Sequence, residues 1–182
     1  MRADAQRNRA KIVDAARLVF REKGYGASLD EIAKTAGVGP GTLYRHFPTR
    51  DDLLDAVMQS WVEKVETATD KALAHEGTPR DVLIDWFETY VDLISTYKGN
   101  PAKITSALGD PESPIVTKCQ VLTAATKRVL DELEPSLRPG TEPIKVARLV
   151  GGVAAVADQS DLDDAAVRPL LEVVADGLLS GG

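Results

Sequence analysis

Residues Ser28 to Phe47, S-L-D-E-I-A-K-T-A-G-V-G-P-G-T-L-Y-R-H-F, form two short amphipathic segments on either side of a glycine-bearing turn. The first segment repeats apolar side chains with helical spacing, at Leu29, Ile32, Ala33 and Ala36. Ser28 and Glu31 have the spacing of a capping box, in which a hydroxyl and a carboxylate each bind an exposed backbone N–H group. Gly37 is expected to end this helix in a left-handed conformation, which costs glycine no Cβ clash.

The second segment is compatible with a helix from Pro40 onward, because a first-turn N–H group has no partner in the helix and proline loses nothing there. Leu43 and Phe47 lie four residues apart, on the face that would pack against the first helix. Two short helices joined by a tight turn make a helix-turn-helix, whose second helix fits the major groove of DNA. The sequence therefore predicts this motif.

The remaining side chains of the second helix suit a nucleic-acid surface. Tyr44 and His46 can reach phosphate oxygens, and Thr42 can reach a base edge or a thymine methyl group. A small helical hairpin with a glycine turn and a surface tyrosine, without any role in DNA binding, is the alternative interpretation.

The same region resembles the N-terminal domain of the TetR family of transcriptional regulators, over about residues 8 to 56. The resemblance extends through these residues: Ile12 to Ala16, Leu18 to Phe20, Gly24-Tyr25, Asp30 to Ala33, Ala36 to Val38, Gly41 to Phe47 and Asp52 to Leu54. A weaker likeness to the C-terminal domain of some members covers the tail. The resemblance implies a homodimeric, ligand-responsive regulator, most often a repressor.

The resemblance also implies roles for individual residues. Thr42 and Tyr44 match positions at base edges and the adjacent backbone, whereas His46 and Arg50 match phosphate-contacting positions. Ser28 is a further phosphate candidate, and Arg45 is expected either beside the groove or in an intramolecular salt bridge. The sequence departs from the family pattern at Gly39-Pro40-Gly41, where relatives more often carry polar or basic side chains. The expected DNA-binding set is Ser28, Gly39, Pro40, Gly41, Thr42, Tyr44, Arg45, His46 and Arg50.

The net charge of −6 is unevenly distributed along the chain. Residues 1–47 hold nine Lys and Arg and five Asp and Glu, a net charge of +4, and the remainder holds thirteen and twenty-three, a net charge of −10. A basic head on an acidic body would present only the head to phosphate.

Helical periodicity continues to the end of the chain, and no strand alternation or internal repeat interrupts it. The expected fold is all-α: a three-helix helix-turn-helix domain over residues 1–48, then a body of about six helices over residues 49–182. A long helix from Thr49, with Asp52 in capping position, would link the two domains.

The last two predicted helices carry more apolar residues than one neighbouring helix can cover. Such a pair suggests a two-fold, four-helix interface with a second copy of the chain, although an ordinary core hairpin is the alternative. The expected interface residues are Val146, Val150, Gly151, Val153, Ala154, Val167, Leu170, Leu171, Val174 and Leu178.

Aromatic and apolar side chains in the body are candidates for a pocket that binds an unknown, largely apolar effector. An aromatic stripe at helical spacing is also typical of plain core, and this alternative stays open. The candidates are Trp61, Trp86, Tyr90, Leu93, Ile104, Leu108, Cys119, Leu122 and Thr126. No cofactor or metal is expected, because His75 has no ligand-spaced partner, and Cys119 on an apolar face is expected to be buried and inert.

Other classes of protein fit the sequence less well. A single cysteine excludes an intramolecular disulfide, and the absence of a long apolar run predicts a cytoplasmic protein with no membrane partner. No nucleophile elbow, phosphate-binding loop or dinucleotide fingerprint predicts an enzyme. A helical protein-binding adaptor that has lost DNA binding is the alternative function, and the Gly39-Pro40-Gly41 stretch keeps it open.

Overall fold

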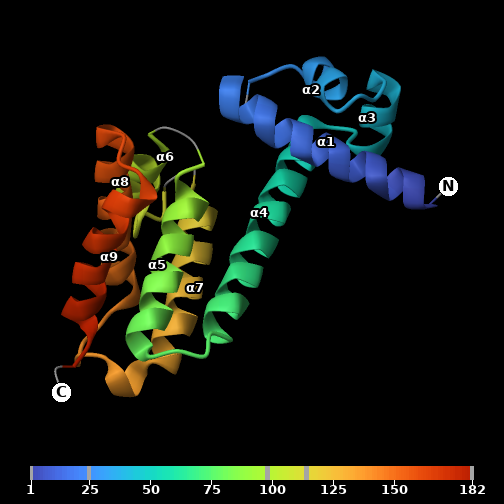
Figure 1. The fold of residues 1–182 in the computed structure, drawn as a ribbon. Helices are drawn as coiled ribbons and strands as arrows, with labels where there is room; N and C mark the ends of the chain where they lie inside the picture. Colours follow the sequence, from blue (N-terminus) through green and yellow to red (C-terminus); the bar gives the residue numbers. More distant parts are fainter. Residues whose placement is uncertain (1, 24–25, 97–98, 113–114, 181–182) are drawn as a thin grey trace. The chain divides into compact units, whose positions relative to one another are not determined.

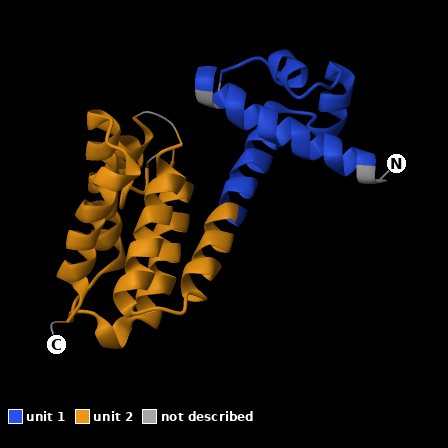
Figure 2. Ribbon diagram, viewed as in Figure 1, with its two compact units in different colours: residues 1–63 blue, residues 64–182 orange. Residues whose placement is uncertain are grey.

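A computed structural model describes residues 2–23, 26–96, 99–112 and 115–180. In these ranges the regular structure is helical, apart from an isolated antiparallel bridge between Leu137 and Leu179, which confirms the all-α prediction (Figure 1). The chain forms two compact units, residues 1–63 and 64–182 (Figure 2). Gly24 and Tyr25, which contribute to the family resemblance, lie outside the described residues.

The first unit contains the predicted helix-turn-helix. Its helices are α1 (Arg2–Lys23), α2 (Leu29–Thr35), α3 (Pro40–His46) and the first part of α4 (Arg50–Leu73). One apolar core joins all four, and its largest fully buried side chains are Ile12, Ile32, Leu43 and Leu53. Gly37 has a φ of +67°, as predicted for the residue that ends the first helix of the motif.

The start of α4 belongs to this unit, so the unit extends past the expected boundary at residue 48. Asp52 accepts hydrogen bonds from the Thr49 backbone N–H (2.9 Å) and hydroxyl (2.6 Å), and the Thr49 hydroxyl accepts one from the Asp52 N–H (3.1 Å). The bonds from Thr49 lower the pKa of the Asp52 carboxyl group. Leu53 and Ala56 follow within the next turn and are buried in the same core, because residues three apart lie on the same face of a helix.

Among its described residues, the second unit contains the rest of α4, five further α-helices and one 3-10 turn. The bounds are α5 Pro79–Ile94, α6 Asn100–Ala107, α7 Val116–Glu132, η1 Glu134–Ser136, α8 Pro143–Ser160 and α9 Asp164–Leu178. Helix α8 packs against α5, α6, α7 and α9, so it is the central helix of this unit. Throughout the part of the chain that the structure describes, no helix is both long and apolar enough to cross a membrane.

Helix α6 is fastened to α8 at both ends and touches it closely in the middle. The Asp158 carboxylate accepts a hydrogen bond from the Gly99 N–H (2.7 Å), and Arg148 donates one to the Leu108 carbonyl (2.8 Å). Between them, a Cβ atom added to Gly151 would lie 2.2 Å from the Thr105 hydroxyl oxygen. The missing side chain of Gly151 therefore permits this approach of α6, since any larger residue would overlap Thr105.

Ion pairs connect α5 to α9 on the surface of the second unit. Arg80 contacts Asp176 at 2.6 Å, and Arg168 contacts Glu88 at 2.6 Å. All four side chains are more than a third exposed, and exposed pairs contribute about 0–1 kcal/mol each. The buried faces of α5 and α9 therefore supply most of the stability of this contact, and the ion pairs fix the alignment of the helices.

Candidate nucleic-acid interface

The turn of the helix-turn-helix is formed as predicted, but its expected capping box is not. The Ser28 hydroxyl accepts a hydrogen bond from the Asp30 N–H (3.1 Å) and caps α2. Glu31, which was expected to complete the box, instead pairs with Lys23 at the end of α1. A cation within reach competes with the backbone N–H group for the carboxylate, so Glu31 ties α1 to α2. Ser28 is exposed at the start of α2, where a phosphate oxygen can also approach it.

The two faces of α3 separate as its sequence predicts. Leu43 is fully buried, and Phe47, directly after the helix, is 2 % exposed. Tyr44 is 47 % exposed and Arg45 is also exposed, whereas Thr42 and His46 are half-buried. Arg45 forms no ion pair with any described residue, which favours the position beside the groove over the intramolecular salt bridge. The helix thus presents a hydroxyl, a phenol, an imidazole and a guanidinium away from its core face.

The start of α3 exposes mainly backbone atoms, because Gly39 and Gly41 have no side chains. Gly39 has an extended conformation before the helix, and its carbonyl accepts hydrogen bonds from the N–H groups of Thr42 (2.9 Å) and Leu43 (3.2 Å). Pro40 occupies the first helical turn, as predicted. A Cβ atom on Gly39 or Gly41 would meet no heavy atom within 4 Å, so neither glycine is required by packing.

Arg50 lies at the start of α4 and is partly committed to the fold. Its guanidinium donates a hydrogen bond to the Ala27 carbonyl (2.7 Å), just before the cap of α2. Arg50 was expected to contact phosphate directly. The bond to Ala27 assigns it a structural role as well, because it joins the beginnings of α2 and α4.

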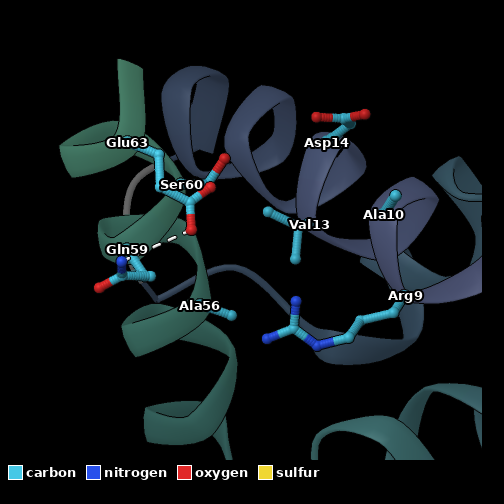
Figure 3. A pocket seen from close by; sticks show the side chains of 8 residues that line it. All are labelled: Arg9, Ala10, Val13, Asp14, Ala56, Gln59, Ser60 and Glu63. Carbon is cyan, nitrogen blue, oxygen red and sulfur yellow. Dashed lines mark hydrogen bonds between the residues drawn. The ribbon is translucent and has the colours of Figure 1, made fainter. Parts of the chain in front are cut away.

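A cleft of about 300 Å³ lies between α1 and α4 within the first unit (Figure 3). Ala10, Val13 and Ala56 line it together with polar side chains, namely Arg9, Asp14, Gln59, Ser60 and Glu63. The Arg9 guanidinium carbon lies 5.3 Å from the centre of the Phe47 ring. Helix periodicity could not have revealed this contact, because Arg9 and Phe47 belong to segments that are far apart in the sequence.

Seven of the nine candidate effector residues come together in the buried interior of the second unit, where Leu93 is half-buried. The buried seven are Trp86, Tyr90, Ile104, Leu108, Cys119, Leu122 and Thr126. Trp61 belongs to the first unit instead, because the helix that carries it, α4, is divided between the units and Trp61 precedes the division. The structure therefore does not group Trp61 with the others.

The hydrogen bonds that the structure shows among these buried candidates join uncharged groups. The Trp86 indole N–H donates to the Thr126 hydroxyl (3.3 Å), and the Cys119 thiol donates to the Ile104 carbonyl (3.7 Å). The Tyr90 hydroxyl is buried without a hydrogen-bond partner among the described residues, and the hydroxyl of Thr105, which sequence reasoning missed, is in the same state. Burial, followed by the proximity of Cys119, raises the pKa of Tyr90, and burial also raises the pKa of the Cys119 thiol.

Most of the expected interface residues of the last two helices are buried within the single chain. Val153, Val174 and Leu178 are half-buried, and Leu170 is 39 % exposed. The six buried within the second unit are Val146, Val150, Gly151, Ala154, Val167 and Leu171. Those of α8 lie in the helix that packs against α5, α6, α7 and α9, and those of α9 lie in the helix that packs against α5 and α8. The exposed apolar residues of this region are Leu170, from the expected set, and four others outside it: Leu149, Val156, Leu162 and Val173.

Comparisons with known proteins match both parts of this architecture. Residues 12–57 match the family of bacterial regulatory proteins of the TetR type, and residues 78–180 match an SbtR-like transcriptional regulator C-terminal domain. A helix-turn-helix-type transcriptional regulator of Staphylococcus aureus is 47 % identical over 60 residues, which is 32 % of each chain. The curated relatives are thus matched over about a third of their length.

Solved structures match over nearly the whole chain. A TetR transcriptional regulator of Streptomyces coelicolor is 30 % identical with a TM-score of 0.69, and the match covers 96 % of this chain and 99 % of that one. A second TetR regulator, from Chloroflexus aurantiacus, has a TM-score of 0.71 over 100 % of both chains at 18 % identity, a likeness of fold alone.

Proposed function

This chain belongs to the TetR family of bacterial regulatory proteins, and from that membership we propose that it is a homodimeric repressor released from a palindromic DNA operator by a small molecule. The observation that carries the DNA-binding part is the division of α3, with Leu43 and Phe47 buried and Tyr44 and Arg45 exposed. The chain is a transcriptional regulator by family rather than an enzyme, and its proposed place of action is the cytoplasm, where its DNA target lies.

In this proposal, α3 enters the major groove. Thr42 reads a base edge, Tyr44 and His46 bind flanking phosphates, and Ser28 adds a hydroxyl at the start of α2. Because the first turn of α3 has no side-chain donor at Gly39 or Gly41, base reading depends on few residues, and the shape of the DNA contributes to specificity. Occlusion of a promoter by the bound protein accounts for repression.

Two copies are required because one α3 reads only a few base pairs. A two-fold dimer places the second α3 about 34–36 Å, or one turn of DNA, further along the duplex. The apolar residues that face outward from α8 and α9 support this dimer, above all Leu149, Val156 and Val173, which are each more than half exposed in the single chain. Two copies of this face would cover each other in a four-helix arrangement.

The effector is proposed to bind in the interior formed by α5, α6 and α7. Its lining is apolar and aromatic, so the ligand is proposed to be largely apolar. The buried Tyr90 hydroxyl supplies one polar contact, because a buried donor without a partner costs about 1–3 kcal/mol that a ligand oxygen can recover. Effector and operator affinities are then coupled, typically by about 1–3 kcal/mol, and α4, which contributes to both units, transmits the change.

Two hydroxyl deletions test whether the Tyr90 hydroxyl contributes nothing to folding stability, as expected of a group that serves to bind a ligand. Tyr90→Phe is expected to leave the free energy of unfolding unchanged or higher, since it removes an unpartnered hydroxyl. Thr126→Val is the matched control. It is expected to lower that free energy by about 1–3 kcal/mol, because it leaves the Trp86 N–H group unpaired. Urea unfolding of both variants gives the comparison, and an equal loss in the two would contradict the proposal.

The regulator proposal itself is tested by selecting binding sites from random duplex DNA with the purified full chain. The expected result is a palindrome with half-sites separated by about 10–10.5 base pairs centre to centre, or a multiple of it. Absence of enrichment at low salt, from folded dimeric protein, would overturn the DNA-binding proposal and favour the protein-binding adaptor. The same palindrome then serves as the probe for an effector screen.

A further inference from the structure

Arg9 differs in its surroundings from three other basic residues of α1, namely Arg7, Arg17 and Lys23. Arg7 pairs with Asp4, Arg17 contacts Asp14 at 3.1 Å, and Lys23 pairs with Glu31. Arg9 has no carboxylate partner among the residues that the structure describes, and its recorded contact is with the Phe47 ring. Among the described residues, no ion pair therefore neutralises the Arg9 guanidinium.

The contact with Phe47 holds the guanidinium in a defined place without using its hydrogen-bond donors. Phe47 is 2 % exposed and is fixed in the core. An arginine above an aromatic ring is attracted to it by the ring quadrupole, while its N–H groups, which lie at the edge of the guanidinium plane, stay available. A planar cation with five donors is the side chain best suited to bind phosphate oxygens.

The location of this cation matches the proposed DNA surface. Phe47 directly follows His46, whose ring centre lies 6.4 Å from that of Phe47. The guanidinium therefore lies beside the end of α3, whose last turn contains Arg45 and His46. Arg9 also lines the cleft between α1 and α4, so there is open space next to its side chain. Asp14 and Glu63 also line that cleft, and Figure 3 draws both carboxylates away from the Arg9 guanidinium.

We infer that Arg9 binds a phosphate of the DNA backbone next to the one contacted by His46, so that α1 extends the interface beyond the helix-turn-helix. This inference rests on the proposed function, because it requires that α3 bind DNA. The phosphate contact of Arg9 would also add DNA affinity that the first turn of α3 lacks, because Gly39 and Gly41 supply no side-chain donor. A contact to phosphate carries affinity and register but no sequence preference.

The test measures binding of the full chain to a 30-base-pair random-sequence duplex across a salt series, because phosphate contacts do not depend on sequence. Arg9→Gln removes the charge, and Arg9→Lys keeps it. Each lost phosphate contact is expected to reduce the slope of log K against log salt by about 0.9, or about 1.8 for a dimer. Arg9→Gln should show this reduction, Arg9→Lys should retain the wild-type slope, and Arg7→Gln, whose arginine is already paired with Asp4, should also retain it.

The outcomes separate the inference from the function on which it rests. No binding of wild-type protein to this duplex or to selected DNA overturns the proposed function. Binding by wild type with an unchanged slope for Arg9→Gln overturns the inference alone. An equal loss in Arg9→Gln and Arg9→Lys would also overturn it, because it would assign the effect to packing on Phe47, which the melting temperatures of the two variants check.

Discussion

A chain with glutamate at both Val173 and Leu149 is expected to be monomeric and to bind the operator about 10²- to 10⁴-fold more weakly than the wild type. The two side chains are 72 % and 53 % exposed in the single chain, so the substitutions leave the core of each copy intact. In the proposed dimer they would be buried, and an unpaired buried carboxylate costs several kcal/mol. The loss in DNA affinity follows because two linked heads bind one duplex with an effective concentration that a single head lacks.

Light scattering after size-exclusion chromatography measures the mass, and titration of a selected palindrome measures the affinity. Gln120→Glu is the control, since Gln120 is exposed on α7 and gains one negative charge outside the α8–α9 face; each single glutamate variant is compared with it. If the double variant remains a dimer with full affinity, the proposed dimer does not use these residues.

The second large effect is expected from Leu43→Ala in the core of the first unit. Leu43 is fully buried between α3 and the other helices of the head, and a buried Leu→Ala change costs about 2–5 kcal/mol. Because α3 is a single short helix that is held mainly by this side chain and Phe47, DNA binding should be lost while the body stays folded. Hydrogen exchange followed by mass spectrometry should show faster exchange in residues 1–63 and unchanged exchange in 64–182.

Leu18→Ala provides the matched control for this change. It removes the same atoms from α1, but Leu18 is 50 % exposed and lies outside the core. It should cost well under half as much and preserve DNA binding. Equal destabilisation by both variants, or loss of protection throughout the chain in Leu43→Ala alone, would show that the head does not unfold as a unit.

Local signals in the sequence were sufficient for the elements of the head. Gly37 predicted the left-handed end of α2, Pro40 predicted the start of α3, and Thr49 with Asp52 predicted the start of α4. Each depends on residues a few positions apart, where backbone geometry leaves few alternatives. The capping box at Ser28 failed because Glu31 found a partner eight residues away, Lys23, which helix spacing does not reveal.

The outer face of the body could not be predicted from periodicity. Helices α8 and α9 are apolar on more than one face, so the pattern does not say which face meets the same chain. Only the packing shows that Val150 and Leu171 turn inward and that Leu149 and Val173 turn outward. The contact of Arg9 with Phe47 could not be predicted from the sequence either, because it depends on how helices that are distant in the sequence pack together.

At Gly41, the stability of the fold and the proposed binding of DNA favour different residues. An alanine there would meet no neighbouring atom within 4 Å, and alanine has a higher helix propensity than glycine. The fold alone would therefore gain from a side chain at this position, whereas in the proposed complex its absence lets the α3 backbone lie closest to the duplex. Residue 41 is thus a natural starting point for redesigning operator preference, because a new base-reading side chain can be installed there without rebuilding the head.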